Sequence, residues 1–418
     1  MRATDKAKLK NHLVKEAEPE STPDLNELHI EFTVLDMGFF LRANVSWKKG
    51  VTYGKLIEYY LAQARSFLPN CIAVFDGYTD SSSSTKFMTQ SKRATTVVPS
   101  NNVDLAPHLP FNCDSKEAFF ANTTNKQAFI NMLSKAMEDK GIQVFHAKDD
   151  ADQLIAKKAI ECAVDYPTQV ISEDTDIFQL LVSQLKPNSK ELYMVTSKLK
   201  ATNPCIDIKA IRSKIGNDNA QYLPVLHAVS GCDTTSSPHN IGKITVWNKR
   251  DEIIKEAGPF LLPNSTPEEI EEAGRKILCI LYNENKEPYN LDIIRLNKFE
   301  KNVIKSMKSV DIQSLPPTNS AAKYHSFRVY YQVQVWLGNE TLDPTDWGWK
   351  FVNGHLFPMT MDNAPAPQEL LKVIKCGCTL YCENNQCTCK KNGLFCSDLC
   401  DNCNGGNCTN TDISHVID

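Results

Sequence analysis

The sequence has no long apolar run. No stretch of about 18 residues is both apolar and uncharged, so we expect no transmembrane helix. The first 28 residues are polar and charged and contain no apolar segment typical of a secretory signal peptide. We therefore expect a disordered tail over residues 1–28 and a soluble, intracellular protein. The net charge is only −4, which neither favours nor excludes a nucleic-acid partner.

Apolar residues make up 42% of the 418 residues and charged residues 23%, which is typical of packed domains. Short apolar runs alternate with segments of helical periodicity between residues 29 and 245. This alternation predicts a three-layer α/β/α domain with a mostly parallel sheet. Residues 246–340 are expected to be largely helical, residues 341–374 to form a linker, and residues 375–410 to form a small Cys-rich module.

Aspartates follow the ends of the predicted strands. They are Asp36, Asp76, Asp150, Asp152, Asp174 and Asp176. The carboxyl ends of parallel strands meet at one edge of the sheet, so we expect these side chains to gather. A single Asp at a helix start is often an N-cap, but six gathered carboxylates repel one another unless a cation offsets their charge. Oxygen ligands of this kind suit Mg²⁺ or Mn²⁺, and a pair of ions is typical of nucleases and polymerases.

A seventh acid, Asp233, lies in the segment SGCDTTSSPHNIGK. The turn that follows it contains Gly242, and backbone amides in such a turn can hold a phosphate or a monovalent cation. Nearby histidines have no metal-ligand spacing. His227, within an apolar helix, is expected to be a core residue, and His146 and His239 are given no role.

Five acidic segments in order resemble the structure-specific 5′-nuclease family, the flap endonucleases with a PIN-like domain. The segments are VLD, VFDGY, DDAD, SEDTD and SGCDTTSSPHNIGK. The resemblance implies that all seven aspartates are catalytic metal ligands. Asp150, Asp152 and Asp174 would hold a first Mg²⁺ or Mn²⁺ ion, with Asp36 and Asp76 close by. The family usually has glutamates at the positions of Asp150 and Asp152.

The same resemblance implies a second ion, held by Asp176 and Asp233. It also matches Gly242 and Lys243 to the family's turn that grips the duplex backbone. The loop after Asp76 offers Lys86, Lys92 and Arg93 as nucleic-acid contacts, and solvated loop charges are the alternative.

Nine of the 15 cysteines lie close together near the C-terminus. They are Cys376, Cys378, Cys382, Cys387, Cys389, Cys396, Cys400, Cys403 and Cys408. Such a segment has too little apolar material for a core and needs metal. A cluster of about three tetrahedral Zn²⁺ ions has four ligand positions for each ion. Nine thiolates can fill all of these positions if three of the thiolates each bind two ions. Disulfides are the alternative.

The cysteine spacing resembles the CXC domain of tesmin/TSO1-like proteins. This resemblance implies zinc binding and often DNA binding, for which Lys390 and Lys391 are the candidate phosphate contacts. A zinc-stapled module that binds a protein partner is the alternative.

Together, these patterns predict a nuclear, metal-dependent phosphodiesterase that cleaves DNA in preference to RNA, with branched or single-stranded ends. Two alternatives remain open. The first is a catalytically inactive nucleic-acid-binding or scaffold protein with the same fold. The second is a protein derived from a mobile element that kept both modules.

Overall fold

The computed structural model describes most of the chain. The described residues are 5–18, 20–43, 45–67, 70–77, 85, 97–148, 150–196, 205–284, 287–305, 312–339, 341–362, 375–379, 381–396, 400–405 and 408–411. Lys86, Lys92 and Arg93 lie outside them. In the described part of the chain, no helix combines the length and the apolar character that a membrane crossing needs.

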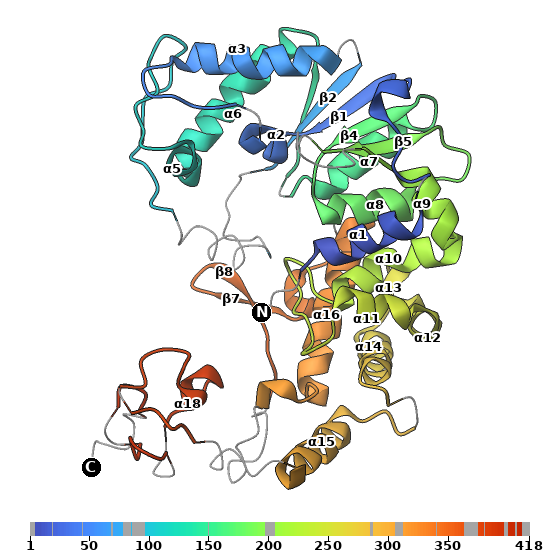
Figure 1. The fold of residues 1–418 in the computed structure, drawn as a ribbon, viewed down its shortest axis with the longest axis vertical. Helices are drawn as coiled ribbons and strands as arrows, with labels where there is room; N and C mark the ends of the chain where they lie inside the picture. The colour runs from blue at the N-terminus through green and yellow to red at the C-terminus, as the bar shows by residue number, and fades with distance from the viewer. Residues whose placement is uncertain are drawn as a thin grey trace.

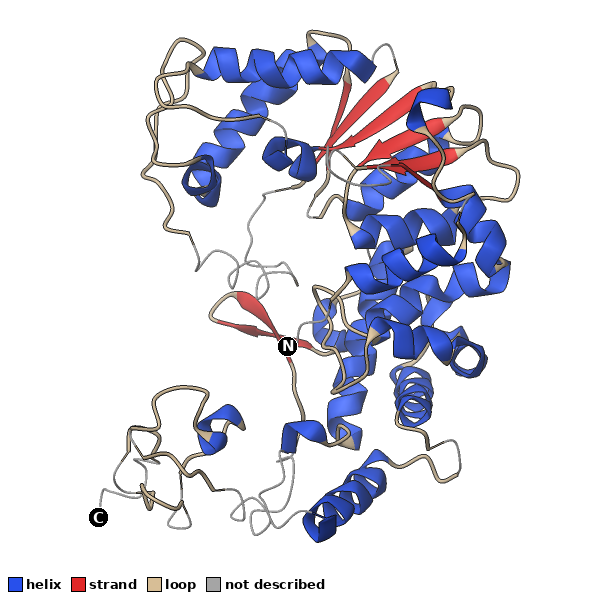
Figure 2. Cartoon of the chain, in the orientation of Figure 1, coloured by secondary structure: helices blue, strands red, loops and turns tan. Residues whose placement is uncertain are grey.

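A mostly parallel sheet forms the centre of the upper part of the molecule in Figure 2. Its six strands, within the described residues, have the order β3-β2-β1-β4-β5-β6. Their bounds are β1 Phe32–Asp36, β2 Cys71–Phe75, β3 Gln143–His146, β4 Thr168–Ile171, β5 Leu192–Val195 and β6 Cys205–Asp207. Neighbouring strands are parallel except β6, which runs antiparallel to β5. The predicted α/β fold with a mostly parallel sheet is confirmed.

Helices cover both faces of the sheet. Alternate residues of each strand point to opposite faces, and apolar strand residues on both faces are buried against these helices. Leu35 and Phe75 pack with the first group of helices, and Val34 and Val74 with the second. The first group is α2 Met37–Ala43, α3 Tyr53–Ala64, α5 Lys116–Ala121 and α6 Thr123–Glu138. The second group is α7 Asp152–Cys162, α8 Thr175–Gln184, α9 Ile208–Ile215 and α10 Asn217–Val229.

The region after residue 242 is helical, as predicted. Its helices are α11 Lys243–Asn248, α12 Arg250–Glu256, α13 Gly258–Leu261, α14 Pro267–Leu281, α15 Leu291–Lys305 and α16 Asn319–Trp336. α14 crosses α16 so closely that a Cβ atom on Gly274 would lie 1.9 Å from Ser326 Oγ. α16 also packs on α10, which joins this region to the core of the sheet domain.

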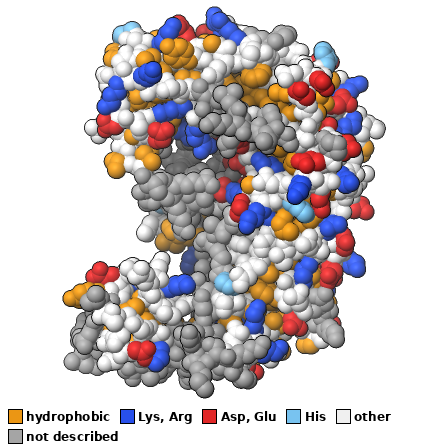
Figure 3. Space-filling view, viewed as in Figure 1, with side chains coloured by type: hydrophobic (Ala, Val, Ile, Leu, Met, Phe, Trp, Pro, Cys, Tyr) orange, Lys and Arg blue, Asp and Glu red, His pale blue; other side chains and the backbone are white. Residues whose placement is uncertain are grey.

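Shorter elements complete the described structure. They are the 3₁₀ helices Leu25–Glu27, Arg65–Phe67, Ile312–Ser314 and Pro344–Trp347, the hairpin of β7 Trp349–Val352 and β8 His355–Pro358, and α18 Thr388–Lys391. The hairpin lies within the predicted linker, and α18 lies among the cysteines. Figure 3 shows charged side chains of both signs mixed over the visible face, in keeping with the small net charge.

The N-terminal segment differs from the predicted disordered tail, because α1 occupies Ala7–Glu16. Leu9 and Leu13, four residues apart, lie on one side of this helix and are only 2% and 0% exposed. They join the hydrophobic core, and α1 packs against α8, α9 and α11. Figure 1 shows α1 in dark blue beside α8. The sequence did not predict this helix because the segment is rich in lysine and has only two buried leucines. These leucines become buried only against the rest of the folded chain.

Candidate active site

Asp36 and Asp76 lie at the carboxyl ends of β1 and β2, which are paired neighbours. A Cβ atom on Gly38 would lie 3.1 Å from Asp76 Oδ2 and 3.3 Å from Asp36 Oδ1, so both carboxylates crowd the first turn of α2. Asp36 accepts hydrogen bonds from Ser172 Oγ at 2.7 Å and from the Phe39 amide at 3.0 Å. Burial, opposed by these two bonds, raises the pKa of Asp36 to about 6.

Asp152, Asp174 and Asp176 form a three-carboxylate group. One oxygen of each lies within 4.8 Å of the other two. Asp152 is the first residue of α7, and Asp174 is the N-cap of α8, where its Oδ1 accepts the Asp176 amide at 2.7 Å. The N-terminal ends of two helices therefore meet at this group. Negative side chains are most stable at this end of a helix because the helix dipole is positive there.

Electrostatics in this group favours a bound cation. Asp174 reaches solvent at the mouth of the site, yet the protein displaces much of the water around it. This desolvation, followed by repulsion from Asp152 and Asp176, raises the pKa of Asp174 to about 7. The donors are all carboxylate oxygens, so the group fits Mg²⁺ or Mn²⁺.

Asp176 is buried and is held from two sides. His227 Nε2 lies 2.9 Å from Asp176 Oδ1, and Lys6 Nζ lies 3.3 Å from Asp176 Oδ2. Lys6 Nζ also lies 2.7 Å from Asp233 Oδ1. Burial lowers the pKa of Lys6, but the attraction of Asp176 and Asp233 outweighs it and leaves the pKa above its usual value. Lys6 is therefore a fixed cation inside the acidic site.

His227 is the buried core histidine that the sequence predicts, but it also contacts the site. Burial, followed by the nearby charge of Lys243, lowers its pKa to about 4, so the ring is neutral near pH 7. An ionised carboxylate only accepts hydrogen bonds, so Nε2 carries the proton and donates it to Asp176. Within the described residues, Nδ1 has no hydrogen-bond partner.

Asp150 and Asp233 are placed differently from the three-carboxylate group. Asp150 lies two residues before Asp152, the first residue of α7, and does not belong to the three-carboxylate group. Asp233 lies in the loop after α10, where Gly231 has a φ of +102° and a Cβ atom on it would lie 2.8 Å from the Ser237 amide nitrogen. This tight bend turns the chain back toward α10 and brings Asp233 to Lys6.

The prediction that Lys243 contacts nucleic acid is wrong. Its side chain is only 1% exposed, and Nζ donates to the carbonyl oxygens of His227 and Gly231, each at 2.6 Å. Burial lowers its pKa to about 7. Lys243 thus ties the end of α10 to the loop that carries Asp233. Gly242 is the N-cap of α11, and a Cβ atom there would meet no other atom within 4 Å.

Two basic residues that sequence reasoning missed lie near Asp76. Burial lowers the pKa of Lys126, on α6, to about 8, and the charges of Asp76 and Arg42 act on it in opposite directions. Arg42, on α2, donates from Nε to the Gly38 carbonyl at 2.8 Å. Neither residue belongs to a motif, because only the packing of α6 and α2 on the sheet brings them to the acids.

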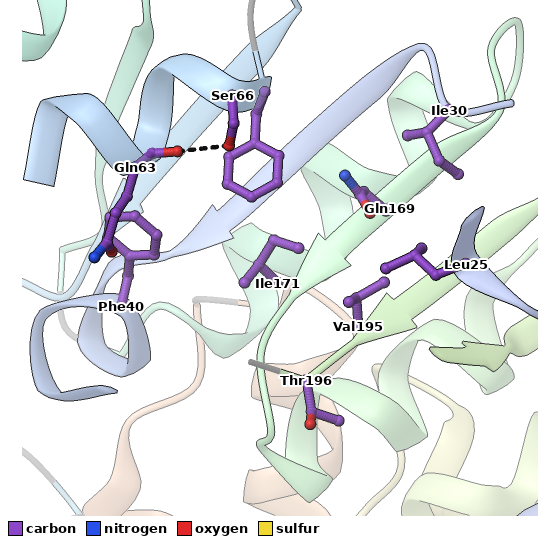
Figure 4. A pocket seen from close by; sticks show the side chains of 10 residues that line it. Leu25, Ile30, Phe40, Gln63, Ser66, Gln169, Ile171, Val195 and Thr196 are labelled. Carbon is purple, nitrogen blue, oxygen red and sulfur yellow. Dashed lines mark hydrogen bonds between the residues drawn. The ribbon is translucent and has the colours of Figure 1, made fainter. Parts of the chain in front are cut away.

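A separate pocket of about 550 Å³ lies over β4 and β5, as Figure 4 shows. Its lining is mostly apolar and includes Phe40, Ile171 and Val195. None of the described residues that line it is an aspartate, so this pocket lacks the carboxylates of a metal site.

The C-terminal cysteines converge as metal ligands do. Three overlapping groups of four are close enough to bind an ion, and Cys376 belongs to all three. The Sγ atom of Cys376 lies 3.7 Å from that of Cys382 and 3.8 Å from that of Cys396, and Cys389 lies 3.5 Å from Cys400. Four sulfurs bound about 2.3 Å from one zinc ion lie about 3.8 Å apart, so the spacing fits. All nine thiols are free, so the disulfide alternative is not observed.

The two lysines beside these cysteines are both exposed. Lys390 Nζ donates to the Glu383 carbonyl at 2.6 Å. On the other side, Lys375 pairs with Asp401 at 2.5 Å. Positive charge around the cysteines is therefore partly neutralised within the module itself.

No family model matches the chain, and no curated protein matches it. Several solved structures are similar. The catalytic core of Rad2 in complex with DNA substrate has 12% identity and a TM-score of 0.39, covering 86% of this chain and 92% of that chain. Human GEN1 in complex with Holliday junction DNA has 12% identity and a TM-score of 0.37, covering 83% and 85%. Flap endonuclease-1 from Methanococcus jannaschii has 13% identity and a TM-score of 0.33, covering 75% and 96%. At such low scores and identities, the function rests on the chain's own residues.

Proposed function

We propose that this protein is a divalent-metal-dependent phosphodiesterase that cleaves nucleic acid at the carboxyl edge of its parallel sheet. The observation that carries the proposal is the three-carboxylate group of Asp152, Asp174 and Asp176, whose oxygens lie within 4.8 Å of one another. Asp36 and Asp76 lie at the ends of two neighbouring strands of the same sheet. A scaffold has no use for three gathered carboxylates that repel one another, so the group favours catalysis over an inactive fold.

In this proposal Asp152, Asp174 and Asp176 hold an Mg²⁺ or Mn²⁺ ion. Such an ion activates water and stabilises the leaving oxygen of a phosphodiester when it is bound. Other residues of the chain hold the carboxylates in place: Ser172 orients Asp36, and His227 orients Asp176. Lys126 and Arg42 supply positive charge beside Asp76, where a substrate phosphate would otherwise meet only carboxylates.

We further propose that the substrate is DNA in preference to RNA, with a branched or single-stranded end, and that the protein is nuclear. These proposals rest on the order of the five acidic segments. The turn at Gly242 and the residues Lys86, Lys92 and Arg93 are proposed as backbone contacts on the same ground. The cysteine module is proposed to bind about three zinc ions, and either Lys390 and Lys391 contact DNA or the module binds a protein partner.

A cleavage assay tests the proposal. Purified protein would be incubated with labelled 5′-flap, hairpin and single-stranded DNA and RNA, in Mg²⁺, Mn²⁺ or EDTA. The Asp174→Asn variant removes a carboxylate from the site, and Asp218→Asn removes an exposed one in the first turn of α10 as a matched control. We expect metal-dependent cleavage by the native chain and the control only. Binding without cleavage would support the inactive scaffold, and cleavage by Asp174→Asn would reject the assigned ligands.

A further inference from the structure

We propose that the Lys6 ammonium takes the place of a second divalent cation, so that the acidic site binds a single Mg²⁺ or Mn²⁺ ion. This inference rests on the proposed function, because it assigns the number of ions at the same site. The motif resemblance gives Asp176 and Asp233 to a second ion. In the structure, Lys6 Nζ lies between these two carboxylates, 3.3 Å and 2.7 Å from their oxygens.

One oxygen of Asp176 and one of Asp233 already contact the Lys6 ammonium, so a second ion would compete with Lys6 for both atoms. Asp176 Oδ2 faces Lys6, and Asp176 Oδ1 accepts the hydrogen bond from His227. An ammonium is a compact charge with three donors, so it can satisfy two carboxylates as a metal ion would. A divalent ion could bind between Asp176 and Asp233 only by displacing Lys6.

The position of Lys6 is built into the fold. Lys6 is the N-cap residue of α1, and Leu9 and Leu13 anchor that helix in the core. Lys10 Nζ donates to the Glu173 carbonyl at 2.8 Å, which ties α1 to the segment that carries Asp174 and Asp176. At the far end, the Ser21 carbonyl accepts a hydrogen bond from the Asp207 amide in β6. The helix and the chain that follows it are therefore both attached to elements of the sheet domain.

Removing the ammonium should open the second position. In Lys6→Ala, Asp176 and Asp233 would keep their places but lose their counter-charge, and a second divalent ion would restore it. Lys8→Ala is the matched control, because Lys8 is an exposed lysine on the same helix.

The experiment counts Mn²⁺ ions per chain by electron paramagnetic resonance titration of the full chain with its zinc in place. We expect one tightly bound Mn²⁺ in the native chain and in Lys8→Ala, and two in Lys6→Ala. Two ions in the native chain would overturn this inference alone, and that result needs no variant to fold. One ion in Lys6→Ala, with a native melting profile, would also overturn it. No bound ion in the native chain would overturn the proposed function and this inference together.

Discussion

The imidazole of His227 and the carboxylate of Asp176 form a buried pair, with Nε2 2.9 Å from Oδ1. The pair joins α10 to the start of α8 and fixes which way the Asp176 carboxylate faces. Residues that orient a metal ligand typically change metal affinity about 10–100-fold when they are removed.

Replacing His227 with Phe should therefore weaken Mn²⁺ binding about 10–100-fold while the core stays filled. Calorimetric titration of Mn²⁺ measures the effect. His325→Phe is the control, since His325 is also buried and bonds the Val229 carbonyl rather than an acid. Equal losses in the two variants would mean that His227 has only a packing role.

Lys126→Ala should slow cleavage about a hundredfold and leave Mn²⁺ affinity unchanged, because Lys126 is proposed to face the substrate phosphate rather than the ion. Single-turnover rates on the best substrate of the cleavage assay measure this. Lys135→Ala removes an exposed lysine from the same helix and should have no effect. A variant of Lys126 that cleaves at the native rate would remove this residue from the proposal.

The acidic site makes stability depend on pH when no divalent ion is added. The folded pKa of Asp174 is raised to about 7 from an ordinary value of 3.8, so the folded state binds more protons than the unfolded state between these values. The contribution of Asp174 to stability should then fall as pH rises from about 4 to about 7, so the native chain should lose stability relative to Asp174→Asn over this range. Asp174→Asn should flatten this loss, and Mn²⁺ should reverse it in the native chain at pH 8. Melting temperatures of both chains across pH measure these effects, and an Asp174→Asn chain with the same pH dependence as the native chain would contradict the assignment to Asp174.

Cys376 belongs to every group of four thiols that could bind an ion, so its loss should disturb the whole module. Metal analysis should give about three zinc ions per native chain and fewer than about two in Cys376→Ser. Cys162→Ser, on α7, should keep the native content. A native value near zero or one would reject a cluster with shared thiolates.

Much of the fold follows from local patterns. The strands β1 and β2 are mostly apolar runs that end at or just before an aspartate, β4 ends three residues before Asp174, and parallel topology brings these ends together. The three residues of β6 are too few for a periodic signal, and its antiparallel pairing depends on β5. The sequence therefore predicts that the aspartates gather at this edge, but the motif resemblance grouped Asp152 and Asp174 with Asp150, whereas the structure groups them with Asp176.

The residues that complete the site could not be predicted from the sequence. Lys6 and His227 reach Asp176 from α1 and α10, and nothing near either residue in the sequence marks that contact. Lys243 has the sequence context of a surface lysine, yet two backbone carbonyls satisfy its ammonium inside the protein. Burial of a lysine depends on acceptors that only the folded chain supplies.

The docking of α1 also bears on where this protein can be shortened. A chain that began at residue 29, the start of the predicted α/β domain, would lose Leu9 and Leu13 and expose the apolar surface of α8, α9 and α11 that they cover. Such a fragment would be prone to aggregate, and any ion counted in it would belong to an altered site. The first helix is thus a structural part of the domain that follows it.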